Sequence, residues 1–376
     1  MSPRPDDPRP DDPSPDDAGS LDDGSKPPSH QRRPRYAGTH PKRFEERYKE
    51  LASDQYPEIV PHVMAKGRTP AGQHVPILVA EILELLAPVP GERVVDATLG
   101  WGGHARRLLE CIVPGGHLLG LDADPIELPR TEARLRALGH DDRVFTAKRT
   151  NFAGLPAALA AVGWHDGADV VLADMGVSSM QLDNPARGFT FNAPGPLDMR
   201  MNPNRGQSAA EWLARASAAE IASVLREHAD EPCADELAQA LAAKEGALHS
   251  TEALSAAVRK ALARRPDDEA EQSVRRVFQA LRIQVNDEFG SLDALLRALP
   301  FGLRPGGRVA MLTFHSGEDR RVKQAFLQGE REGLYSSIAP DVIRAGSKER
   351  YDNPRSRSAK LRWARRAAQG ATSTGP

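Results

Sequence analysis

The segment 94–110, VVDATLGWGGHARRLLE, constrains the fold more than any other part of the chain. Two valines end in Asp96, three glycines follow within four positions, and an amphipathic stretch comes next. This pattern is typical of a buried strand that continues into a helix through a turn too tight for side chains. Two more apolar runs end in an acid, HLLGL at Asp122 and ADVVLA at Asp174. Because these runs alternate with helical patterns, we expect an α/β fold with a parallel sheet covered on both faces.

The glycine turn narrows the class of ligand. Parallel sheets bind ligands outside the carboxyl ends of their strands, so Asp96, Asp122 and Asp174 mark a candidate site. A P-loop is excluded because His104 and an alanine stand where it needs Lys-Ser or Lys-Thr. A dinucleotide turn stays open, since Asp122 lies nineteen residues beyond Gly103 and suits a ribose hydroxyl.

Asp96 weighs against a pyrophosphate. An acid before the first glycine would repel phosphates but would suit an ammonium group. S-adenosylmethionine meets these demands, because it carries an amino acid end, a cationic sulfonium, a ribose diol and an adenine without any phosphate. Helix amides after Gly103 would suit its carboxylate, and Asp122 its ribose.

After Asp183 the rhythm changes from alternating strands and helices to helices alone. Ser208 to Glu211 and Ser217 to Glu220 are capping boxes, and further helices are expected over 232–246 and 251–263. We therefore expect an inserted helical domain.

The segments on either side of this region favour packing onto the sheet. A helix is expected over 75–86, before the glycine turn. A stripe of apolar residues from Val274 to Phe289 predicts a long helix that returns to the sheet as core packing. The segment 303–316 predicts a turn and another buried strand.

Composition bounds the class of protein. Hydrophobic residues make up 40% of the 376 and charged residues 27%, as in a globular protein. No stretch approaches the roughly 20 apolar residues of a membrane helix, and no secretory signal is apparent. Cys111 and Cys233 lack metal or disulfide spacing, so we expect no metal site and a cytoplasmic location. Residues 1–45 form an acidic extension rich in proline and aspartate, which we expect to be disordered.

The C-terminal end is basic. Residues 344–366 hold nine lysines or arginines against Glu349 and Asp352. One interpretation of 353–366 is a poorly ordered tail that binds RNA phosphates. The competing interpretation is a tail that folds back and completes the edge of the sheet, with its arginines in solvent.

Several long motifs stand together in order. They are HVPIL (74–78), ATLGWGGHA (97–105), LADMGVSSMQLDNPARGFTF (172–191), GPLDMRMNP (195–203), FQALRIQVNDE (278–288), FHSGEDR (314–320) and NPRSRSAKLR (353–362). Together they resemble the bacterial ribosomal RNA small subunit methyltransferase H family, also called MraW. The resemblance covers nearly everything except the N-terminal extension.

This resemblance implies a fold and an activity. The expected fold is a Rossmann-like class I S-adenosylmethionine-dependent methyltransferase sheet with an inserted helical domain. The expected reaction is methylation of the exocyclic N4 amine of one cytidine in the decoding region of 16S ribosomal RNA, with the small ribosomal subunit as partner. The domains expected are a methyltransferase part over 46–182, a substrate-recognising helical insertion over 183–272, a second methyltransferase part over 273–340 and a basic tail over 341–376.

The resemblance also implies the site residues. Cofactor contacts fall on Gly102, Gly103, His104, Asp122, Phe152, Asp174 and Gln181. Phe152 would offer a flat face to adenine, and Asp174 is placed to accept hydrogen bonds from the target amine.

Other acceptors of those amine hydrogen bonds stay open. Asp198 is a second candidate catalytic acceptor, although a salt bridge with Arg200 or Arg205 explains it equally well. His315, Glu318 and Asp319 are further candidates for the same cleft.

Three alternatives remain at this stage. A nicotinamide-dependent oxidoreductase would use the same sheet, another RNA methyltransferase would modify a different position, and an inactive relative would only bind RNA. The sequence leaves the oligomeric state open, a homodimer included.

Overall fold

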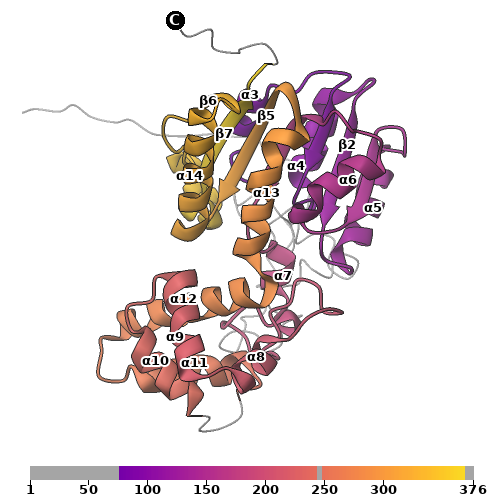
Figure 1. Cartoon of the computed structure of the whole chain (residues 1–376). Helices are drawn as coiled ribbons and strands as arrows, with labels where there is room; N and C mark the ends of the chain where they lie inside the picture. Colours follow the sequence, from indigo (N-terminus) through magenta and orange to yellow (C-terminus); the bar gives the residue numbers. More distant parts are fainter. Residues whose placement is uncertain (1–75, 244–247, 369–376) are drawn as a thin grey trace, which may run out of the picture. The chain divides into compact units, whose positions relative to one another are not determined.

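The computed structural model describes residues 76–243 and 248–368. The predicted acidic extension, 1–45, and the end of the helix expected over 232–246 lie outside these residues. At the centre is one seven-stranded sheet in the order β3-β2-β1-β4-β5-β7-β6 (Figure 1). Its strands are β1 (Arg93–Asp96), β2 (His117–Asp122), β3 (Phe145–Arg149), β4 (Ala168–Asp174), β5 (Leu303–Thr313), β6 (Tyr335–Ile338) and β7 (Lys360–Arg366).

Five of the strands run parallel. β1 lies between β2 and β4, with Val95 opposite both Leu119 and Val171. β3 and β5 extend the parallel part on either side. β7 runs antiparallel to both of its neighbours, β5 and β6. This order confirms the predicted class I methyltransferase fold.

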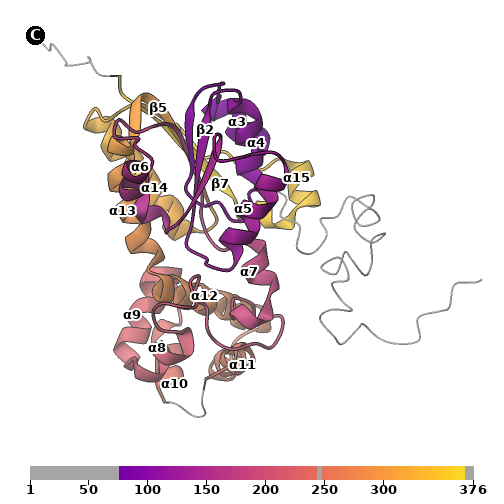
Figure 2. The same ribbon diagram turned by 90° about the vertical axis from the view of Figure 1, so that its right-hand side faces the viewer.

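Helices cover both faces of the sheet, as Figure 2 shows. One face carries α3 (Val79–Leu86), α4 (Gly103–Ile112) and α5 (Glu127–Ala137), and the other carries α6 (Leu155–Ala161), α13 (Glu288–Gly302) and α14 (Ser316–Arg331). Val94 and Val95 show the alternation of a two-sided strand, because they are fully buried in different apolar clusters. The long apolar runs in the sequence follow from this double burial.

The expected helical insertion is present between β4 and β5. After the short α7 (Ser179–Asp183) come α8 (Ala209–Arg215), α9 (Ala218–Ala229), α10 (Ala234–Ala242), α11 (Thr251–Ala261) and α12 (Asp267–Asn286). Ser208 and Ser217 form the predicted capping boxes, each with both reciprocal hydrogen bonds. These helices bury an apolar cluster of their own.

The long apolar stripe differs from its prediction. Asp287 adopts a left-handed conformation (φ 48°), and this ends α12 before α13 begins at Glu288. Val274 and Leu281 are buried among the insertion helices rather than against the sheet. The helical cluster therefore extends beyond residue 272, the end of the predicted insertion.

The C-terminal segment corrects a second expectation. After α15 (Ser347–Asp352), residues 360–366 form β7 inside the sheet instead of a poorly ordered tail. Leu361 and Ala364 are fully buried. Arg362 is also buried and bonds Asp319 of α14 at 2.6 Å. The segment thus folds back onto the body, as the competing interpretation held, although the ion pair keeps Arg362 out of solvent.

Candidate functional site

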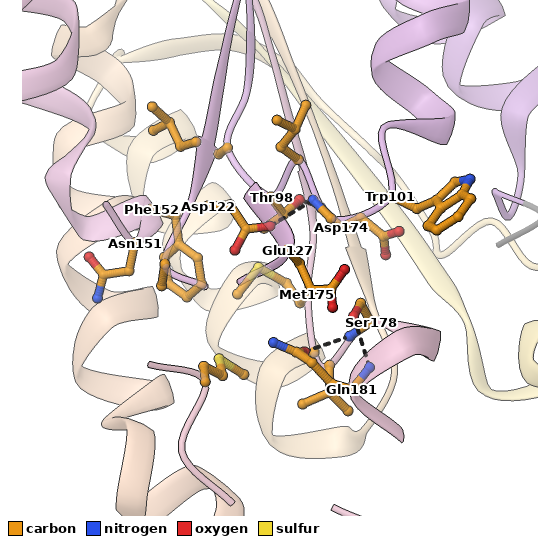
Figure 3. Close-up of a pocket in the computed structure, with 18 of the residues that line it drawn as sticks. Thr98, Trp101, Asp122, Glu127, Asn151, Phe152, Asp174, Met175, Ser178 and Gln181 are labelled. Carbon is orange, nitrogen blue, oxygen red and sulfur yellow. Dashed lines mark hydrogen bonds between the residues drawn. The ribbon is translucent and has the colours of Figure 1, made fainter. Parts of the chain in front are cut away.

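A pocket opens at the carboxyl ends of β1, β2 and β4 (Figure 3). It encloses about 990 Å³ of space, part of which is open to solvent. Six of the predicted site residues line it together: Gly103, His104, Asp122, Phe152, Asp174 and Gln181. The motifs that carry them are up to 78 positions apart in sequence (181 minus 103), so the fold assembles the site.

The glycine turn forms the wall between β1 and α4. Gly102 has φ of 81°, a backbone conformation that favours glycine, and does not line the pocket. A Cβ atom there would lie 2.9 Å from the Thr131 side chain, so this glycine allows α5 to pack closely. Gly103 begins α4 and does line the pocket.

Asp122 ends β2 and is held by two backbone amides. Its Oδ2 accepts from the Gly100 N–H at 2.9 Å, and its Oδ1 accepts from the Asp124 N–H at 2.8 Å. Burial raises the pKa of Asp122 to about 6, against the lowering effect of these hydrogen bonds. The carboxylate is fixed in direction and keeps one lone pair on each oxygen for a ligand.

Asp174 ends β4 and holds the least satisfied carboxyl group of the pocket. Its Oδ1 is buried without a hydrogen-bond partner. Its Oδ2 lies 3.6 Å from His104 Nδ1, too far for a hydrogen bond. Burial raises the pKa of Asp174 to about 8, with further contributions from Asp96 and Glu318. A cationic ligand or an N–H donor beside Oδ1 would relieve this cost.

His104 and Asp96 lie near the Asp174 carboxyl group, and neither adds a positive charge. Burial lowers the pKa of His104 to about 4, so the ring is neutral at pH 7. Its Nε2 lies 2.9 Å from the Ile77 carbonyl and therefore carries the proton. Asp96 is 2% exposed and does not line the pocket, and burial raises its pKa to about 7.

Phe152 follows β3 and starts a short 3₁₀ turn, Phe152–Gly154. Its ring packs against the core yet stays partly exposed to the pocket. In Figure 3, Phe152 and Asn151 lie on one side of Asp122, and Asp174 lies on the other. The pocket thus runs from an apolar face, past one carboxylate, to another.

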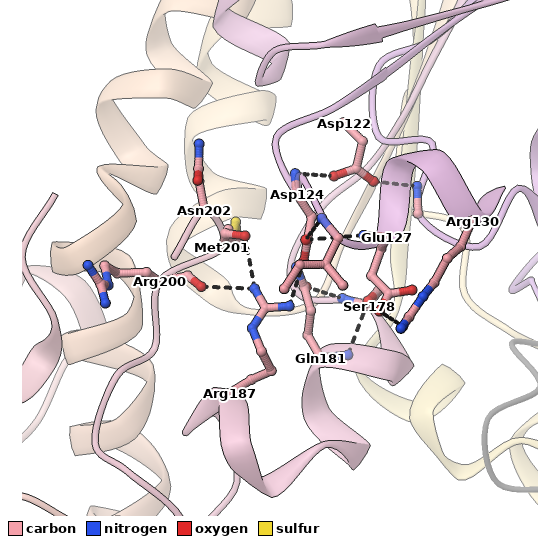
Figure 4. Close-up of polar contacts among 12 residues, drawn as sticks. Asp122, Asp124, Glu127, Arg130, Ser178, Gln181, Arg187, Arg200, Met201 and Asn202 are labelled. Atoms are coloured by element: carbon pink, nitrogen blue, oxygen red, sulfur yellow. Dashed lines mark hydrogen bonds and ion pairs between the residues drawn. The ribbon is translucent and has the colours of Figure 1, made fainter. Parts of the chain in front are cut away.

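Gln181 lines the pocket, but the protein engages both ends of its amide. Oε1 accepts from the Ser178 N–H in a capping box, and Nε2 donates to Asp124 at 2.9 Å. Asp124 also pairs with buried Arg187 at 2.7 Å (Figure 4). Arg187 in turn donates to the carbonyls of Arg200 and Met201. This network joins the loop after β2 to the segment that leads into the insertion.

Asp198 does not line the pocket. It forms a two-point ion pair with Arg200, at 2.9 and 2.6 Å, which is the salt bridge named as its alternative. Burial opposes ionisation, yet the hydrogen bonds from Arg200 leave the pKa of Asp198 below its usual value. The catalytic role of Asp198 stays a prediction without support from this geometry.

The other cleft candidates, His315, Glu318 and Asp319, also lie outside the pocket lining, although Phe314 reaches it. Glu318 is buried and lies 3.1 Å from His315 Nε2. Asp319 is engaged by Arg362 of β7.

Sequence reasoning missed Thr98 and Glu127. The Thr98 hydroxyl accepts from the Asp174 N–H at 2.6 Å and ties the ends of β1 and β4 together. Glu127 begins α5 and lines the pocket. The available signal for Glu127 was the helix-start pattern from Asp124 to Glu127, an acid followed three positions later by another.

The described ranges, 76–243 and 248–368, also bear on a metal site and on a membrane span. No group of three or more metal-ligating side chains is present there. No helix in the same ranges is long and apolar enough to cross a membrane.

Comparison with known proteins gives a consistent picture. The model of the MraW methylase family matches residues 71–367. Ribosomal RNA small subunit methyltransferase H 1 of Lachnoclostridium phytofermentans is 47% identical over 347 residues, which cover 90% of this chain and 94% of the relative. Ribosomal RNA small subunit methyltransferase H 2 of Alkaliphilus metalliredigens is 49% identical over 344 residues, covering 90% and 98%.

Proposed function

Because the chain belongs to the MraW methylase family, we propose that it transfers a methyl group from S-adenosylmethionine to the exocyclic N4 amine of one cytidine in the decoding region of 16S ribosomal RNA. The relatives are named for the small-subunit ribosomal RNA, and this chain spans 94–98% of their length. A cytoplasmic location, where ribosomes are, belongs to the same proposal.

The residues of the pocket fit the cofactor. Phe152 offers a partly exposed aromatic face for adenine, and Asp122 offers free lone pairs for the ribose hydroxyls. Gly103, at the start of α4, offers helix N-terminal amides for the carboxylate. The carboxyl group of Asp174, which lines the pocket, suits a neighbouring cationic group of the cofactor.

Asp174 has the central role in the chemistry. The cofactor supplies an electrophilic methyl group. The cytosine amine is a weak nucleophile, because its lone pair is delocalised into the ring. Asp174 Oδ1 accepts a hydrogen bond from this amine and stabilises the positive charge that develops on nitrogen as the bond forms. Thr98 fixes the end of β4 and so orients Asp174.

Gln181 holds neighbouring parts of the site in place. Its amide orders the start of α7 and holds Asp124, and it lies against the pocket while doing so. We expect contact with the cofactor through its remaining N–H, which leaves the predicted cofactor role of Gln181 in place.

The observation that carries the site assignment is the buried, unpartnered Asp174 Oδ1 at the end of β4. The test is transfer of a labelled methyl group from S-adenosylmethionine to 16S ribosomal RNA, followed by identification of the modified nucleoside. An inactive relative would bind RNA and the cofactor without turnover, and this assay separates the two functions.

A further inference from the structure

Glu127 lines the pocket and has one carboxylate oxygen without a hydrogen-bond partner. Its side chain is only 9% exposed, and Oε1 bonds Arg130 at 2.9 Å. Oε2 is buried and has no hydrogen-bond partner. An unsatisfied buried carboxylate oxygen is costly, so a donor from a ligand would stabilise it.

The position of Glu127 is set before any ligand binds. Asp124 Oδ1 accepts the backbone N–H groups of Ile126 and Glu127, and this fixes the first turn of α5. Asp124 is itself held by Gln181 and Arg187 (Figure 4). The Glu127 carboxylate is therefore anchored to the same network that shapes the pocket.

Glu127 lies beside the carboxylate assigned to the ribose. Both residues line the pocket, and Figure 3 shows the Glu127 side chain between Asp122 and Ser178. Asp122 already accepts one backbone amide on each oxygen, so each oxygen keeps one lone pair for a ligand. A ribose diol offers two donors, and two neighbouring carboxylates accept one each.

We propose that Glu127 accepts a hydrogen bond from one ribose hydroxyl of the adenosyl group and so makes the pocket select ribose over a deoxyribose. This inference rests on the proposed cofactor, and it adds a second acidic residue to the nucleoside site. Arg130, largely exposed, holds the other oxygen of Glu127 from the rim.

The test is calorimetric binding to the full chain of S-adenosylhomocysteine and of its 2′-deoxy and 3′-deoxy analogues. Glu127→Ala is expected to weaken the binding of S-adenosylhomocysteine about 10- to 100-fold, which is the range for a hydrogen bond to a charged group. It should also lose discrimination against one of the two deoxy analogues. Glu127→Gln keeps an acceptor oxygen, so its affinity for S-adenosylhomocysteine should lie between the affinities of Glu127→Ala and the wild type.

Two controls separate this role from a structural one. Glu132→Ala, on the same helix and paired with Arg136, should bind like the wild type. Arg130→Ala removes the ion pair of Glu127 but leaves its Oε2 in the chain, so it should reduce discrimination between the analogues less than Glu127→Ala does. Equal discrimination by Glu127→Ala and the wild type, with melting temperatures alike, would overturn the inference. A wild-type chain that binds no S-adenosylhomocysteine would instead reject the proposed function.

Discussion

Asp174 is the residue whose environment and proposed task are most closely linked. Asp174→Asn keeps the shape of the side chain but removes the carboxyl group that, once ionised beside the cationic cofactor, accepts a hydrogen bond from the amine. We expect turnover to fall at least tenfold at saturating cofactor and RNA, or roughly 1.4 kcal/mol of transition-state stabilisation. Single-turnover methyl transfer measures this. Wild-type turnover in the variant would remove Asp174 from the mechanism.

The same carboxyl group should lower stability as the pH rises. Burial raises its pKa from 3.8 to about 8. Between these two pH values the folded state therefore holds a proton that the unfolded state has released. Its favourable contribution is therefore lost as the pH rises toward 8. Asp174→Asn, neutral at every pH, should gain melting temperature relative to the wild type between pH 5 and pH 8.

An exposed carboxylate provides the control for this pH effect. The matched variant is Asp142→Asn, which removes a carboxylate that is 92% exposed. A constant difference in melting temperature between Asp174→Asn and the wild type over this range would contradict the assigned shift.

Asp122 tests the cofactor assignment apart from chemistry. Asp122→Ala removes a carboxylate that faces the pocket and should weaken the binding of S-adenosylmethionine by about 2–3 kcal/mol. Calorimetry measures the loss of affinity, and circular dichroism checks that the variant is folded although it also loses the hydrogen bond from Gly100. Unchanged affinity in a folded variant would show that Asp122 does not bind the ribose.

At the scale of elements, β7 stabilises the sheet. It pairs with β5 and β6 and buries Leu361 completely. Leu361→Ala should lower the free energy of unfolding by about 2–5 kcal/mol, the usual range for deleting a buried leucine. Arg365→Ala, exposed on the same strand, should change it little. Equal effects of the two substitutions in urea denaturation would mean that β7 contributes little to stability.

Arg187 joins two elements that are distant in sequence. Removing it leaves buried Asp124 without its positive partner and frees the carbonyls of Arg200 and Met201. Arg187→Met should destabilise the fold by about 3–5 kcal/mol. Arg143→Ala, which breaks a surface ion pair, should have no measurable effect. Urea titration of both variants tests this, and similar midpoints would contradict the structural role of the network.

The sequence predicted those parts of the fold whose signals come from residues close together in the chain. The glycine turn predicted the helix that the structure shows as α4, Gly103–Ile112, because the end of the strand and the start of the helix are adjacent signals in the sequence. β3 was missed, since FTAKR is short and only Phe145 is fully buried in it. β7 was misread because the partner that buries Arg362 is Asp319, 43 positions away.

The site follows the same rule. The strand-end acids Asp122 and Asp174 were visible as the ends of apolar runs. Glu127 and Arg187 were not, because their roles depend on contacts across the loops of a folded chain. Asp198 looked equally suited to catalysis and to an ion pair, and only the pairing geometry with Arg200 favours the second.

At the scale of the whole molecule, the sheet presents a cofactor pocket and the helical insertion is expected to meet the RNA. The insertion lies between β4, which carries Asp174, and β5. Under the proposed function, RNA recognition by the insertion and methyl transfer at Asp174 would be encoded in neighbouring segments of one chain.

The central claim is tested most directly by methyl transfer to defined RNA. Small subunits reconstituted with unmodified 16S ribosomal RNA, and the same RNA free in solution, would be incubated with tritiated S-adenosylmethionine and either the wild type or Asp174→Asn. The modified nucleoside would then be mapped by mass spectrometry. We predict label on the N4 amine of one cytidine in the decoding region, reduced at least tenfold in the variant. Label on a different base or on ribose, or no transfer to either substrate, would contradict the account.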